Sequence, residues 1–111
     1  MNVKQKGNRF ELAVARMLRP FFPEVGTARN HDRELDNQKV DLVNTYPFLI
    51  QCKHVERGLD PFKVLEEMPD WDYQYKVLLW KKNRRKTLVV MEWDDAEEIL
   101  AMIKRESLWK F

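Results

Sequence analysis

Two short apolar runs, separated by a polar break that contains a proline, lie within residues 40–54 and constrain the fold most strongly. The first run holds Val40, Leu42 and Val43, the break covers residues 44–47, and the second run covers residues 48–50. Runs of this length bounded by turn residues predict β-strands, so we expect a hairpin. Because side chains alternate along a strand, Gln51 and Lys53 share one face of the second strand.

Three polar side chains interrupt this apolar hairpin. If the turn is centred on Tyr46, the register places Asp41 opposite Gln51 and Lys53 one pleat further along. An acid, an amide and an amine then meet on one patch. A solvated polar face of an edge hairpin explains the same pattern, and the spacing by itself does not distinguish the two interpretations.

The whole chain bounds the class of protein. Its 111 residues are enough for one domain with a core, so we expect residues 1–111 to form a single domain. One cysteine excludes an internal disulfide, and no apolar run is long enough to span a membrane. The start of the chain lacks the apolar core of a signal peptide, so we expect a cytoplasmic protein. The net charge of +2 excludes a histone-like wrapper, but residues 81–86 (KKNRRK) concentrate cations and residues 92–98 (EWDDAEE) concentrate acids.

Helical and strand patterns alternate along the chain. Helical spacing predicts helices over residues 8–20, over a short segment that begins at Pro61, and from Asp94 or Asp95 to about Arg105. Strand patterns cover residues 24–29, 75–80 and 87–93, while residues 30–38 read as a polar loop. This order predicts an α/β fold with a single mixed central β-sheet of about five strands flanked by helices.

Glu11 lies at the rim of the buried stripe of the first helix, where its side chain can face a cleft. A capping box formed by Asn8 and Glu11 explains the same glutamate without any chemistry. The acids of the polar loop lie near His31 but match no structural zinc pattern, because cysteine partners are missing. A solvated or substrate-facing loop is the better interpretation.

A set of motifs occurs in a characteristic order along the chain. Lys6-Gly7 precedes Glu11, the spacing D-x9-Q-x-K runs from Asp41 to Lys53, VER follows, and a late strand pair surrounds KKNRRK. This set resembles the PD-(D/E)xK nuclease superfamily, whose members share a restriction-endonuclease-like core. More narrowly, the chain is similar to the small archaeal and phage Holliday-junction resolvases of DNA recombination and to related phage nucleases.

The resemblance implies a Mg²⁺- or Mn²⁺-dependent DNA endonuclease in the cytoplasm of a bacterial, archaeal or infected host cell. The implied catalytic residues are Glu11, Asp41, Gln51 and Lys53. The implied metal ligands are Asp41, Gln51, the backbone carbonyl of Cys52 and, directly or through water, Glu11. Two positions depart from the family pattern, since Val40 replaces a proline and Gln51 replaces the usual acid. The uncharged amide leaves a second hypothesis open, a non-catalytic DNA-binding or accessory protein on a degenerate nuclease fold.

Two groups of basic residues are expected to contact DNA phosphates without reading sequence. They are Lys4, Lys6 and Arg9 in the first helix region, and Lys81, Lys82, Arg84, Arg85 and Lys86 at the hairpin tip. A solvated turn is the alternative for the second group. Because no base-reading motif is present, we expect branched or junction DNA as the partner.

A homodimer is expected because symmetric resolution of a junction requires two cuts and one chain carries one constellation. The late aromatic residues are expected in the core or in dimer contacts, and a protein-interaction module built on them is a third hypothesis. These residues are Trp71, Tyr73, Tyr75, Trp109 and Phe111.

Overall fold

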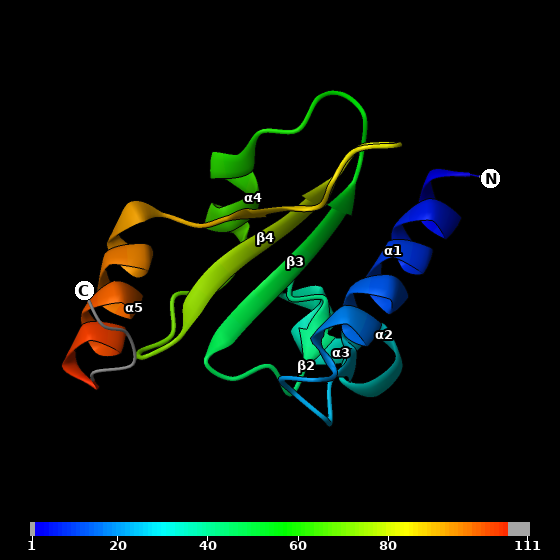
Figure 1. The fold of residues 1–111 in the computed structure, drawn as a ribbon. Helices are drawn as coiled ribbons and strands as arrows, with labels where there is room; N and C mark the ends of the chain where they lie inside the picture. Colours follow the sequence, from blue (N-terminus) through cyan, green and yellow to red (C-terminus); the bar gives the residue numbers. More distant parts are fainter. Residues whose placement is uncertain (1, 107–111) are drawn as a thin grey trace.

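The computed structural model describes residues 2–106 (Figure 1). Within that range five strands form two sheets rather than one. The smaller sheet pairs β1 (Gly26–Thr27) antiparallel with β2 (Leu42–Val43). The larger sheet has the order β3 (Phe48–His54), β4 (Tyr75–Lys81) and β5 (Leu88–Val90), with a parallel and an antiparallel pairing. The predicted α/β class and the number of strands are confirmed, but the single central sheet is wrong.

The expected hairpin at residues 40–54 is only partly formed. β2 pairs with β1 in the smaller sheet, and no strand ladder joins it to β3. One backbone hydrogen bond, from the Asp41 N–H to the Ile50 carbonyl at 2.8 Å, joins the two segments. The Asn44 side chain holds the turn by donating to the Glu24 carbonyl at 2.9 Å. Asp41 thus lies beside β3, as the register predicted, without a continuous strand pair.

The first helix, α1 (Val3–Leu18), begins earlier than predicted. Asn2 caps it, because its side chain accepts from the Gln5 N–H at 2.8 Å while the Gln5 side chain accepts from the Asn2 N–H at 3.3 Å. This reciprocal pair is a capping box. The capping box expected at Asn8 and Glu11 is therefore wrong, and Glu11 lies in the helix interior.

Two short helices, α2 (Ala28–His31) and α3 (Arg33–Asn37), occupy most of the predicted polar loop. α2 also takes the end of the strand predicted over residues 24–29, which shrinks to β1. Asp32 starts α3 by accepting from the Leu35 N–H at 3.0 Å. Helices of one turn present too few residues to show a period, so the pattern could not predict them.

The later elements follow the predicted order, although the strand predicted over residues 87–93 is shortened to β5. α4 (Pro61–Glu67) begins at its proline, and Asp60 caps it by accepting from the Phe62 N–H. The β4–β5 pair surrounds the basic turn, and α5 (Trp93–Arg105) follows. No helix within residues 2–106 is long and apolar enough to cross a membrane.

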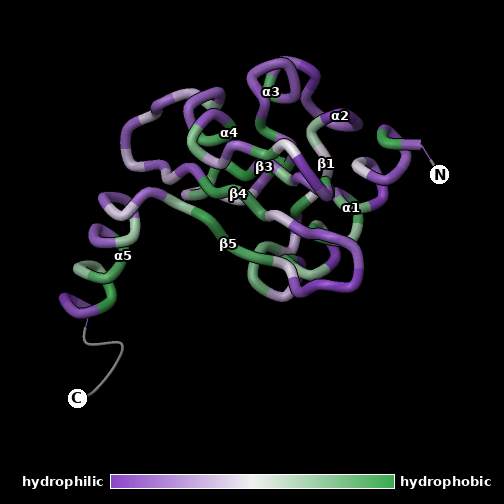
Figure 2. The backbone as a smooth tube through the Cα atoms, turned by 90° about the horizontal axis from the view of Figure 1, so that it is seen from above, coloured by the Kyte–Doolittle hydropathy of each residue, from purple (hydrophilic) through white to green (hydrophobic). Residues whose placement is uncertain are grey.

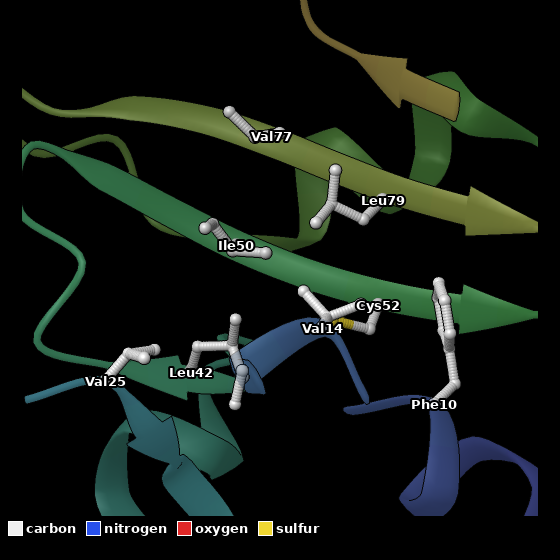
Figure 3. Close-up of a cluster of buried hydrophobic side chains, with 9 residues drawn as sticks. Phe10, Val14, Val25, Leu42, Ile50, Cys52, Val77 and Leu79 are labelled. Atoms are coloured by element: carbon white, nitrogen blue, oxygen red, sulfur yellow. The ribbon is translucent and has the colours of Figure 1, made fainter. Parts of the chain in front are cut away.

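Two buried clusters lie on opposite faces of the larger sheet. α1 packs against the face that carries Ile50 and Cys52, and Figure 3 shows these side chains beside Val14. α4 covers the face that carries Leu49 and Leu78. Along the chain, the sheet strands are mostly hydrophobic, whereas the β4–β5 turn is strongly hydrophilic (Figure 2). β3 therefore lies between two packed layers, and its free edge faces Asp41.

Candidate active site

Asp41 is fixed beside β3 by hydrogen bonds to its backbone and its side chain. Its N–H donates to the Ile50 carbonyl, and its carbonyl accepts from the Ala28 N–H at 2.7 Å. The carboxylate Oδ2 accepts from the Cys52 N–H at 2.7 Å. Because these contacts come from two different segments, the carboxylate has a defined position, and only one of its oxygens is used in them.

The alternation of β3 decides which backbone groups face Asp41. The Ile50 carbonyl and the Cys52 N–H both bond to Asp41, so these two residues direct their backbone groups away from β4. The Cys52 carbonyl therefore faces the same side as the Asp41 carboxylate. The Cys52 thiol is buried in the apolar core near Val14 (Figure 3), and this burial raises its pKa well above the ordinary value.

Gln51 is buried, with 3% of its surface exposed. Its side-chain oxygen Oε1 has no hydrogen-bond partner among the described residues. A buried amide oxygen without a partner costs free energy, so it favours a donor or a cation beside it. The alternative of a solvated hairpin face is wrong at this position.

Glu11 reaches the same region from α1. Its carboxylate Oε1 lies 3.4 Å from Nε of Arg29 in α2, an ion pair whose atoms are not aligned for a hydrogen bond. The Glu11 side chain is 12% exposed. Arg29 thus holds the carboxylate near the helix pair α2 and α3 without neutralising it through a close, directional contact.

One pocket of about 340 Å³, here called the acidic pocket, collects the residues predicted as catalytic. It is lined by Glu11 from α1, by Asp41 before β2, and by Gln51, Cys52 and Lys53 from β3. The half-buried Lys53 has no ion pair among the described residues. Residues distant in sequence are therefore brought together around one volume, in the combination that the motif predicted.

Burial is the main cause that raises the pKa of both carboxyls. The pKa of Glu11 rises to about 7, chiefly through burial and then through the charge of Asp41, while Arg29 opposes the rise. The pKa of Asp41 rises to about 6, chiefly through burial, while the hydrogen bond from Cys52 and the charge of Lys53 oppose it. At neutral pH the acidic pocket therefore holds negative charge at a free-energy cost that a cation would relieve.

The acidic pocket offers a few carboxylate oxygens together with neutral oxygen donors, and this combination suits Mg²⁺. Within residues 2–106, no three His, Cys, Asp or Glu side chains are placed to hold a metal ion together. Mg²⁺ is commonly bound through one or two carboxylates and keeps several waters. Glu11, Asp41, the Gln51 amide and the Cys52 carbonyl fit that mode, and the unpartnered Gln51 oxygen is the observation that supports the fit.

A polar network links the two predicted groups of DNA-binding residues. The Glu56 carboxylate lies 3.1 Å from the Lys6 ammonium and accepts from the Asn83 N–H at 2.9 and 3.0 Å. His54 lies 3.0 Å from the Asn83 side-chain oxygen. The start of α1 and the β4–β5 turn are therefore tied together beside the end of β3.

The cations of the turn have different local roles. The Lys81 ammonium donates to the carbonyls of Lys82 and Arg85, so it braces the turn instead of extending into solvent. The Lys82 ammonium lies 5.6 Å from the centre of the Trp80 ring. The side chains of the remaining predicted cations make no hydrogen bond to another described residue; these cations are Lys4, Arg9, Arg84, Arg85 and Lys86.

Several residues of this region were not among the predicted site residues. Arg29 pairs with Glu11, and Asp36 and Lys39 line the acidic pocket. Asp36 also raises the pKa of both Glu11 and Asp41. The sequence offered only a weak signal for it, an acid in a segment interpreted as a loop. Glu56 carried a signal in the VER motif, but its contacts with Lys6 depend on the fold.

Comparison of the chain with family models, with curated proteins and with solved structures finds no match. The resemblance to PD-(D/E)xK nucleases therefore depends on the motif order and on the composition of the acidic pocket. Both concern the same residues, so a functional proposal for this chain is centred on them.

Proposed function

We propose that the protein is a metal-dependent DNA endonuclease that hydrolyses phosphodiester bonds in branched DNA, in the manner of the PD-(D/E)xK enzymes. One observation carries the proposal. The carboxylates of Glu11 and Asp41, the free-edge carbonyl of Cys52, the Lys53 ammonium and the buried amide oxygen of Gln51, which has no partner among residues 2–106, line the acidic pocket together. A purely structural cluster would pair its buried polar atoms, and this one leaves an oxygen unsatisfied.

The residues of the acidic pocket have separable roles in this proposal. Asp41, Gln51, the Cys52 carbonyl and Glu11 hold Mg²⁺ or Mn²⁺, which when bound neutralises phosphate charge and lowers the pKa of a water. The Lys53 ammonium orients the attacking water and stabilises the negative charge that develops on the phosphate oxygens. The Cys52 N–H keeps the Asp41 carboxylate in position throughout.

Branched DNA is the proposed substrate because the cations flank the acidic pocket on two sides. Lys4 lines the pocket itself, and Lys6 and Arg9 line a neighbouring hollow together with Lys81. Glu56 joins α1 to the basic turn, so the two groups form one surface that can contact phosphates of two duplex arms. We place this activity in the cytoplasm.

A homodimer is part of the proposal, since paired cuts in a junction require two pockets. An apolar groove of about 420 Å³ lies between α1, the larger sheet and α5, and α5 buries no residue completely within its own chain. A second copy would cover that surface. Of the late aromatics, Tyr75 is buried in the chain's own core, Trp71 and Tyr73 are exposed, and Trp109 and Phe111 lie outside the described residues.

The decisive experiment incubates the protein with a four-way junction, a flap and a plain duplex, each with Mg²⁺, with Mn²⁺ and with EDTA. We expect metal-dependent cleavage of the branched substrates and a loss of about 100-fold or more in Lys53→Ala. Lys63→Ala, at an exposed lysine of α4, is the matched control and should cleave normally. Tight DNA binding with no cleavage under any condition would support the non-catalytic alternative, which the uncharged Gln51 favours.

A further inference from the structure

A cross-strand row on the larger sheet places an aromatic residue next to Lys53. The register pairs Lys53 of β3 with Trp80 of β4, and Trp80 with Leu88 of β5. Paired residues of neighbouring strands point to the same face and lie about 5 Å apart. Trp80 is therefore the nearest neighbour of Lys53 across the sheet, on the same face.

Trp80 forms the wall of a basic hollow. The hollow has a volume of about 380 Å³ and is lined by Trp80, Lys82, Arg85, Lys86 and Leu88, here called the Trp80 hollow. None of its lining residues is acidic. Its volume lies within the range of about 300 to 1,000 Å³ that is usual for small-molecule sites. An indole, a leucine and three cations combine apolar surface with positive charge in one hollow.

Residues outside the Trp80 hollow help to fix its shape. The Trp80 indole N–H donates to the Val55 carbonyl at 3.3 Å, which fixes the ring relative to the end of β3. Lys81 braces the turn from within, and the Glu56 carboxylate holds the Asn83 N–H. The Trp80 ring and the backbone of the basic turn therefore keep their relative positions before any ligand binds.

We propose that the Trp80 hollow binds an unpaired nucleotide of a DNA strand, with the base stacked on the Trp80 indole and its phosphates on Lys82, Arg85 and Lys86. This inference deepens the proposed nuclease function and rests on it for the role of Lys53. Combined aromatic stacking and cations are the means by which proteins bind single strands without reading sequence. Bases of an intact duplex are already stacked, so they could enter only after unstacking.

The contact between Lys82 and Trp80 agrees with this proposal. An exposed cation–π contact is weaker than the stacking of a base on an aromatic ring. An incoming base therefore displaces the Lys82 ammonium, which is exposed and stays close enough to meet the adjoining phosphate. The phosphate that follows along the strand then approaches Lys53, because Lys53 and Trp80 are neighbours in one row. Branched DNA with an unpaired nucleotide at the branch is the substrate class that fits both sites.

The test measures binding of a fluorescein-labelled oligothymidylate of about 12 nucleotides, in EDTA so that cleavage does not contribute. We expect Trp80→Leu to weaken binding about 5- to 150-fold, the range for loss of one stacked base, and Trp80→Phe to weaken it less. Trp93→Leu is the matched control, because Trp93 is an exposed tryptophan outside the hollow. Unchanged binding in Trp80→Leu, or an equal loss in Trp93→Leu, would overturn the proposal. Circular dichroism checks that Trp80→Leu is folded. If it is unfolded, Trp80→Phe and the Arg85 and Lys86 double variant described below take its place. Unchanged binding in Trp80→Phe together with an unchanged salt dependence in the double variant would then overturn the proposal.

The charge part is tested with Arg85→Gln combined with Lys86→Gln. For single strands, the slope of the logarithm of affinity against the logarithm of salt concentration becomes shallower by about 0.7 for each phosphate that is no longer neutralised, so the double variant should be shallower by about 1.4. Cleavage of junctions by the wild type is measured separately. Cleavage with no effect of Trp80→Leu on oligothymidylate binding rejects the hollow and keeps the nuclease. Loss of binding in that variant with no cleavage by the wild type supports the hollow and rejects the nuclease.

Discussion

Glu11→Gln is expected to stabilise the metal-free protein at alkaline pH. The pKa of Glu11 is raised from 4.5 to about 7 in the folded protein, mainly by burial. A carboxyl with a raised folded pKa binds its proton more tightly when folded. Its contribution to stability is therefore fully present below pH 4.5 and is lost as the pH rises toward about 7. Glutamine is neutral throughout, so the variant does not suffer this loss.

The size of the effect follows from the shift. At about 1.4 kcal/mol per pKa unit, a rise from 4.5 to about 7 corresponds to about 3 kcal/mol at pH 8. The Glu11 side chain is 12% exposed, and solvent therefore screens part of this cost. We expect Glu11→Gln to raise the free energy of unfolding by about 1 to 3 kcal/mol at pH 8. At pH 5 the same shift yields about a quarter of that value, because folded Glu11 is still mostly protonated.

Urea unfolding in EDTA at pH 5 and at pH 8 measures the difference directly. Glu66→Gln is the matched control, because Glu66 is an exposed glutamate on α4 and does not line the acidic pocket. It should show no comparable gain at pH 8. The raised pKa of Glu11 would be contradicted if Glu11→Gln were less stable than the wild type at pH 8. It would also be contradicted if the gain in the free energy of unfolding were the same at both pH values.

Three further predictions follow from the same structure. In EDTA at pH 8, Gln51→Glu should melt below the wild type because it adds a further carboxyl to those of Glu11, Asp36 and Asp41 in the acidic pocket. Mg²⁺ should raise its melting temperature more than that of the wild type, and an equal Mg²⁺ effect in both proteins would argue against the amide as a ligand. Tyr73→Gly should raise the melting temperature by a few degrees, because the exposed Tyr73 has a φ of 61° that costs a non-glycine residue about 1 kcal/mol, and a clear fall would contradict this. Leu100→Glu, in the apolar groove, should abolish the proposed homodimer in analytical ultracentrifugation, while Leu12→Glu, exposed on α1 outside the groove, should not; a monomeric wild type would refute the dimer.

Local patterns were sufficient wherever an element is long enough to show a period and has a clear end. The helical stripe of α1, the proline that begins α4, and the two apolar runs around KKNRRK were all predictable, because each signal lies within a short stretch of the chain. The spacing from Asp41 to Lys53 likewise predicted that these side chains would meet. A stretch of a few to about fifteen consecutive residues is enough to show each of these patterns.

Shorter elements and pairing partners were beyond such patterns. β1 and β2 have two residues each, and α2 is a single turn, so none of them repeats often enough to be recognised. That β2 pairs with β1 and not with β3 depends on which segment brings unpaired backbone N–H and C=O groups next to residues 42–43 in the folded chain.

The sequence by itself determined the order of the main helices and strands and the set of residues proposed for the catalytic site. Only the tertiary structure decided that Gln51 is buried with no partner among the described residues, that Arg29 and Asp36 act on the carboxyls, and that Trp80 lies beside Lys53. The physical reason is that a residue's period along the chain fixes which side it presents to the core. Its desolvation, its charge neighbours and its cross-strand partner depend on segments distant in sequence, which no local pattern specifies.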